Sequence, residues 1–64
     1  MKELQKEIER VEGVLKAYES RYEHLTEPLA KECVLEVILR VRERLHGLYT
    51  AKELIEEEMK RGGN

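Results

Sequence analysis

The chain contains no Trp, no Phe and no Asp, and only one residue each of Ser, Gln, Asn, Cys and Pro among 64. Without Asp, neither a Ser-His-Asp triad nor an EF-hand calcium loop can be assembled. The single cysteine, Cys33, can form neither a disulfide framework nor a thiolate zinc site within one chain. We therefore expect no catalytic residue, no cofactor and no metal, and we expect a reducing compartment such as the cytoplasm.

Long apolar runs are also missing, since none exceeds three residues. This excludes a membrane span and the apolar core of a signal peptide. The net charge is −2, and both signs are mixed along the whole chain. No segment is basic enough to be a nucleic-acid-binding arm, so nucleic acid is not an expected partner. The abundance of Glu, Lys and Arg, with few Asn, Gln and Cys, is typical of proteins from heat-loving sources.

The residues that are abundant favour helices. Leu, Ile and Val make up 17 of the 64 residues. In the first segment, apolar residues alternate at spacings of three and four, which places them on one stripe of a helix. We predict a helix over about residues 2–24, with Gly13 on its outer face. The stripe consists of Met1, Leu4, Ile8, Val11, Leu15, Tyr18, Tyr22 and Leu25.

A second helix is predicted over about residues 27–46. Thr26 is a suitable N-cap, and Pro28 is tolerated only in the first turn of a helix. The apolar residues of this segment fall on more than one side, which is typical of a helix with several neighbours. We expect Cys33 to lie on the apolar face as a small buried hydrophobe.

Stop signals follow this second helix. Arg40, Arg42 and Arg44 would lie in its last turns, where cations are favoured by the helix dipole. Gly47 suits the left-handed position after a helix, and Leu48 can close the apolar contact that accompanies it. These residues predict that the helix ends at about residue 46.

The next four residues resemble a helix start. Thr50 and Glu53 have the spacing of a capping box, and Tyr49 and Leu54 have that of a hydrophobic staple. We predict a short third helix over about residues 51–61. One small helical domain would then cover residues 1–61, followed by a flexible tail at 62–64.

The predicted fold is all-α: an antiparallel hairpin of helices 2–24 and 27–46, plus the short helix 51–61. The second helix has more apolar surface than two neighbours can cover, so we expect an oligomeric helical bundle. The expected oligomer interface is formed by Val34, Val37, Ile38, Val41 and Leu45. The alternative of a parallel coiled coil is disfavoured, because Glu7 would face Glu12 of the partner helix.

Two groups of residues are candidates for a site. Glu43 and His46 form the Glu-x-x-His pattern of di-iron bundles, but both point off the predicted apolar face, which favours a helix-end role for His46. The second group combines aromatic rings with guanidinium groups, as nucleotide sites do. It consists of Tyr18, Arg21, Tyr22, Arg40, Arg42 and Arg44, and within one hairpin we expect the last three to lie far from Tyr22.

Three functions follow from these features. The first is a small non-enzymatic helical protein that self-associates and acts by binding a partner protein, as regulators and inhibitors do, phage-encoded ones included. The second is an oligomer that sequesters a small anionic ligand, such as a nucleotide, between subunits, in the manner of phage anti-defence sponges. The third is a hairpin dimer that binds RNA, which is supported only by the length of the chain and its predicted hairpin architecture.

Overall fold

The computed structural model describes residues 2–62, which form two helices joined by a short turn. Helix α1 spans Lys2–His24 and helix α2 spans Pro28–Gly62, with no strand in that range. The prediction of an all-α hairpin is confirmed, and α1 has the predicted bounds. The predicted third helix is wrong, because residues 51–61 belong to α2.

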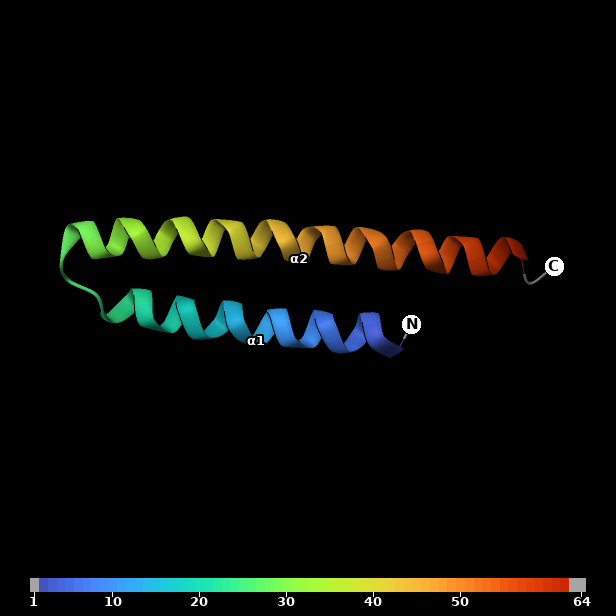
Figure 1. Cartoon of the computed structure of the whole chain (residues 1–64), viewed down its shortest axis with the longest axis horizontal. Helices are drawn as coiled ribbons and strands as arrows, with labels where there is room; N and C mark the ends of the chain where they lie inside the picture. The colour runs from blue at the N-terminus through green and yellow to red at the C-terminus, as the bar shows by residue number, and fades with distance from the viewer. Residues whose placement is uncertain (1, 63–64) are drawn as a thin grey trace.

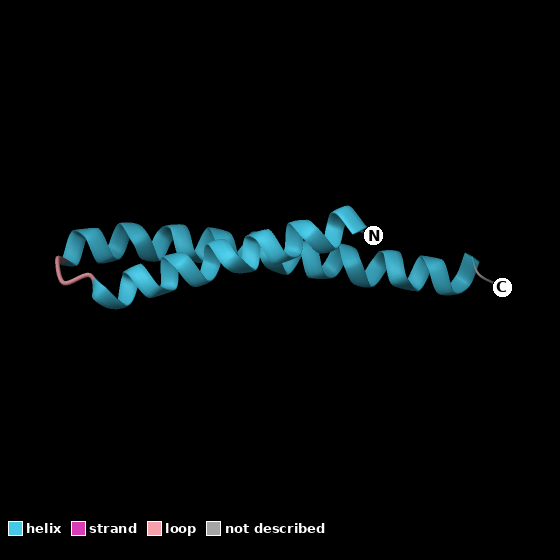
Figure 2. Ribbon diagram, turned by 90° about the horizontal axis from the view of Figure 1, so that it is seen from below, coloured by secondary structure: helices cyan, strands magenta, loops and turns pink. Residues whose placement is uncertain are grey.

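The two helices run antiparallel and differ in length, with 23 residues in α1 and 35 in α2. Figures 1 and 2 show α2 continuing well beyond the N-terminal end of α1. The molecule measures 56 × 15 × 12 Å and has a radius of gyration of 15.8 Å. A compact domain of this length would have a radius of gyration of about 11 Å. The hairpin is therefore a rod with one unpaired end.

The turn between the helices is fixed by Glu27 and Pro28. The backbone N–H of Ala30 donates to the Glu27 carboxylate at 2.6 Å, and the N–H of Lys31 donates to the Glu27 carbonyl at 3.0 Å. Glu27 is thus the N-cap residue, and Pro28 occupies the first helical position, where its missing N–H costs nothing. The predicted N-cap, Thr26, lies one residue too early.

The core is a single seam between α1 and α2. Its buried side chains are Ile8 and Val11 of α1 and Ile38 and Leu48 of α2. Ile8, Val11 and Leu48 form one cluster, and Leu4, Val41 and Leu45 pack against it. The α1 members belong to the predicted stripe. On α2 the contacting residues follow the same alternation of three and four, as in an antiparallel coiled coil.

Polar contacts cross the seam on both of its edges. On one edge, Arg44 lies 3.6 Å from the Glu7 carboxylate. On the other edge, Arg42 pairs with Glu19 at 2.7 Å, and the Tyr49 hydroxyl donates to Glu12. The hydrogen bond to Glu12 raises the pKa of Tyr49 above its ordinary value. Equivalent heptad positions face each other in these pairs, which is the pattern of antiparallel helices.

Gly47 does not end a helix. It lies inside α2, and no glycine among the described residues has a positive φ. The Thr50 hydroxyl donates back to the His46 carbonyl at 3.0 Å, within the helix, instead of capping a new one. The apolar seam on both sides of Gly47 explains this, since Leu45 and Leu48 pack on α1 together only if the helix is continuous. That packing outweighs the roughly 1 kcal/mol cost of a helical glycine.

Other expectations change with this continuity. Arg40, Arg42, Arg44 and His46 lie in the middle of α2, so they have no helix-end role. Cys33 is exposed rather than buried, because α2 has one neighbour and not several. In the predicted tail, Gly62 is the last residue of α2, and residues 63–64 lie outside the described range. Within residues 2–62, neither helix combines the length and apolar character needed to cross a bilayer.

Continuity of α2 at Gly47 predicts that Gly47→Ala stabilises the protein. A Cβ added there meets nothing within 4 Å. The free energy of unfolding should therefore rise by about 0.5–1 kcal/mol, as for any exposed helical glycine. Urea denaturation followed by circular dichroism measures this, with Gly13→Ala in α1 as the matched reference. A loss of helix in Gly47→Ala would show instead that the glycine needs a left-handed conformation.

The N-cap assignment predicts that Glu27→Ala destabilises the hairpin by about 1 kcal/mol, since the N–H of Ala30 loses its acceptor. Thr26→Ala is the control and should leave the urea midpoint unchanged. If Thr26→Ala had the larger effect, the cap would lie at Thr26.

Candidate interaction site

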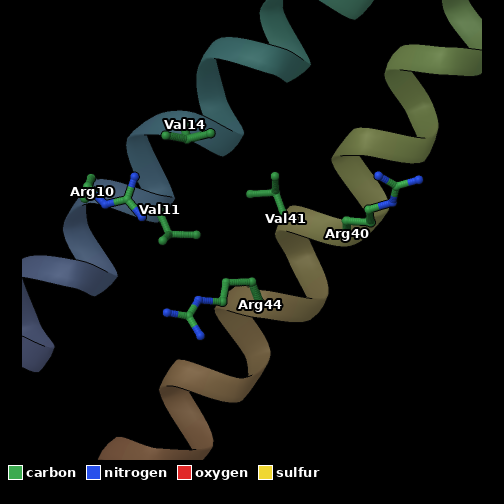
Figure 3. A pocket seen from close by; sticks show the side chains of 6 residues that line it. All are labelled: Arg10, Val11, Val14, Arg40, Val41 and Arg44. Atoms are coloured by element: carbon green, nitrogen blue, oxygen red, sulfur yellow. The ribbon is translucent and has the colours of Figure 1, made fainter.

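The hairpin has a shallow pocket between the helices, midway along α1. Its floor is formed by Val11 and Val14 of α1 and Val41 of α2, and three arginines surround it: Arg10, Arg40 and Arg44. The pocket has a volume of about 190 Å³ and is open to solvent. Figure 3 shows Arg44 reaching from α2 toward α1, with Arg10 on α1 and Arg40 on the outer side of α2. We call this feature the arginine groove.

One carboxylate partly neutralises the arginine groove. Glu7 accepts two hydrogen bonds from Arg10, from Nε at 2.8 Å and from Nη2 at 2.7 Å, and it also faces Arg44. The Arg10 hydrogen bonds, assisted by Arg44, lower the pKa of Glu7 to about 2. Arg10 and Arg44 thus share one carboxylate, whereas Arg40 has no ion pair within residues 2–62. The groove keeps a positive charge above an apolar floor.

A second hollow lies on the opposite edge of the seam. It is lined by Leu35, Ile38 and Arg42 of α2 and by Glu19, Tyr22 and Glu23 of α1. Its only cation, Arg42, is already paired with Glu19. This hollow is therefore acidic, in contrast to the arginine groove.

The predicted nucleotide-binding residues lie in three places: the arginine groove, the second hollow, and the pair formed by Tyr18 and Arg21 on α1. Arg40 and Arg44 line the arginine groove, whereas Arg42 lines the second hollow together with Tyr22. Arg42 and Tyr22 thus meet within one chain, contrary to the expectation that they lie far apart. Two of the tyrosine rings already make cation–π contacts within the chain. The Arg21 guanidinium lies 6.0 Å from the centre of the Tyr18 ring, and the Lys31 ammonium lies 5.0 Å from the centre of the Tyr22 ring.

The residues expected at an oligomer interface face α1 in the structure. Ile38 is only 2% exposed. The others, Val34, Val37, Val41 and Leu45, are half-buried. They form the hairpin's own seam and its margins. An oligomer interface over these residues could therefore bury only the part of each side chain that α1 leaves exposed.

The apolar surface that remains uncovered lies elsewhere. Residues 53–62 of α2, which we call the free end, are all exposed because α1 does not reach them. Leu54 and Met59 are 60% and 61% exposed, and Ile55 is 40% exposed. Leu29, Leu35 and Leu39 are exposed nearer the turn. The sequence signal for the free end is the heptad spacing, which continues through Leu48, Ile55 and Met59. This signal is missed when Gly47 is interpreted as the end of a helix.

The chain offers no metal centre in its described part. No group of three or more His, Cys, Asp or Glu side chains among residues 2–62 is placed to hold a metal ion. Glu43 and His46 of the Glu-x-x-His pattern are both exposed.

Comparison with known proteins finds no matching family model, no matching curated protein and no matching solved structure.

The Glu7 ion pairs predict a pH dependence of stability. The pKa of this carboxylate is lowered in the folded state, so its contribution is complete above its ordinary value of 4.5 and is lost as the pH falls from 4.5 toward 2. Glu7→Gln should flatten the fall in unfolding free energy over that range. Urea denaturation at several pH values measures it. An equally steep dependence in Glu7→Gln would assign the effect to other carboxylates.

Proposed function

We propose that this chain is a small non-enzymatic helical protein that self-associates and acts by binding a partner. The observation that supports this most strongly is the free end of α2, where Leu54, Ile55 and Met59 are exposed on a stretch of helix that α1 does not reach (Figure 1). Exposed apolar side chains gathered on one segment of a small protein favour an interaction site there.

The small core supports the same proposal. Only four side chains of residues 2–62 are buried. Below about 70–80 residues, a single core rarely supplies more than 3–5 kcal/mol, and many such proteins gain stability by association. A two-helix rod, with one seam and no second layer, is an extreme case. Burial of the free end against another molecule would add apolar contact that the chain alone lacks.

The chemistry of the arginine groove also favours binding over catalysis. Its lining consists of valines and guanidinium groups, which match a surface that is both apolar and acidic. Guanidinium groups hold carboxylates in fixed geometry and do not exchange protons near neutral pH. The division of the predicted nucleotide residues among three places gives the ligand-sequestering and RNA-binding alternatives no comparable support.

Sedimentation equilibrium of the purified chain at micromolar concentration tests the proposal. We expect a mass that is a multiple of the 7.6 kDa chain. Replacing Ile55 and Met59 together by Glu should shift the mass toward that of one chain, because association would bury two unpaired charges. Helix content should persist, since both side chains are exposed.

The control for this experiment is Glu57→Gln, which alters an exposed residue of the same segment and should leave the mass unchanged. A single-chain mass for the unaltered protein across the whole concentration range would contradict self-association.

A further inference from the structure

The free end of α2 presents a face that combines apolar and acidic groups. Leu54 and Ile55 lie four and three residues before Glu58, so all three side chains share one side of the helix. All three are exposed. This face has no counterpart on its own hairpin, because α1 ends before reaching it.

The arginine groove has the complementary composition. Three valines form its floor, and Arg10, Arg40 and Arg44 surround them. Glu7 pairs with Arg10 and approaches Arg44, so Arg40 is the one of these three arginines that has no ion pair among the described residues. A helix lying in this groove would place apolar side chains on valine and a carboxylate beside a free guanidinium group.

We propose that the arginine groove binds the free end of α2 from a second copy of this chain, with Glu58 of each copy beside Arg40 of the other. The inference rests on the proposed self-association and names the surfaces that carry it. The two α2 helices lie antiparallel in this pair, so both grooves are filled and every contact is made twice.

The spacing along α2 suits such a reciprocal pair. Arg40 and Glu58 are 18 residues apart, or about 27 Å along the helix. When Arg40 faces Glu58 of the partner, Leu54 comes opposite Arg44, and Gly47 comes opposite Ala51. The two small residues meet at the centre of the pair, where a Cβ on Gly47 has open space in the single chain. The face therefore complements itself in charge at its ends and in size at its middle.

Charge argues against two other positions for the free end. The second hollow is lined by Glu19 and Glu23, which would repel Glu58. Two free ends packed on each other through Ile55 and Met59 would pair equivalent edges, as the hairpin itself does. That arrangement sets Glu56 against Glu56 and Glu58 against Glu58, which is unfavourable.

A charge-exchange experiment tests the proposal by sedimentation equilibrium and native mass spectrometry. The unaltered chain should have twice the chain mass. Arg40→Glu and Glu58→Arg should each raise the dissociation constant by about tenfold or more, since each sets like charges together twice per pair. The double variant R40E/E58R should restore the affinity. A mixture of the two single variants should form a mixed pair, because both of its contacts again join opposite charges.

The matched control is Glu57→Arg, which makes the same charge change one residue away, on the outer face of α2. It should leave the dissociation constant unchanged, and circular dichroism should show the same helix content in all variants. A single-chain mass for the unaltered protein would overturn both this inference and the proposed self-association.

Other results would overturn the inference alone. One is an assembly that neither single variant weakens, and another is a pair that R40E/E58R fails to restore. A third is a bound small anion that co-purifies with the unaltered chain and is lost in Arg40→Glu without a change of assembly. That result would show that the groove holds a small ligand instead of a second copy.

Discussion

The structure depends on one apolar seam shared by two helices of unequal length. Ile8 and Val11 of α1 pack with Leu48 of α2, while Ile38 is buried farther along the seam, and these four are the buried apolar side chains of residues 2–62. Because the seam is the only layer of tertiary packing in residues 2–62, its extent decides which parts of the chain are ordered by contact. Where α1 ends, the apolar stripe of α2 continues without a partner. The unequal lengths therefore both limit the stability of the hairpin and create its main exposed apolar surface.

The polar residues at the margins of the seam give its two edges opposite charge. On one edge, Glu12, Glu19 and Glu23 give an acidic surface in which Arg42 is already paired. On the other edge, Arg10 and Arg44 share Glu7, and Arg40 adds a guanidinium group that has no ion pair among the described residues. Surface ion pairs of this kind contribute little to stability. Under the proposed self-association their larger effect would be on recognition, because the two edges of the rod carry opposite charge and favour different contact surfaces.

Much of the fold follows from the sequence by local rules. The alternation of three and four from Leu4 to Tyr22 predicts α1 and its buried face, and the Leu25–Pro28 segment predicts the turn. The failure at Gly47 has a physical cause. Gly47, Thr50 and Glu53 have the local chemistry of a helix end followed by a helix start, but the tertiary contacts of Leu45 and Leu48 on α1 require continuity. Propensity is a weak preference that such packing overrides.

The candidate site was harder to predict than the fold. That Arg40 and Arg44 would act together follows from their spacing of four on a helix, but their neighbour Arg10 comes from α1 and depends on the register of the hairpin. That register is set by side chains on both helices, which no single segment reveals. The separation of Arg42 from the other two arginines has the same origin, because a spacing of two places residues on opposite edges of a helix.

Because α2 is uninterrupted, it also fixes the angle around the helix axis between the arginine groove and the free end. Residues 45–52 join the arginine groove to the free end as a rigid shaft, held on one side by α1. Each residue of an α-helix turns the chain by about 100°. The direction in which Leu54, Ile55 and Glu58 point, relative to the groove on the same molecule, is thus set by the number of residues between them. Insertion of a single residue within residues 45–52 would rotate the free end by about a quarter of a turn relative to the arginine groove. The amino-acid sequence of both surfaces would stay the same, but they would face different directions.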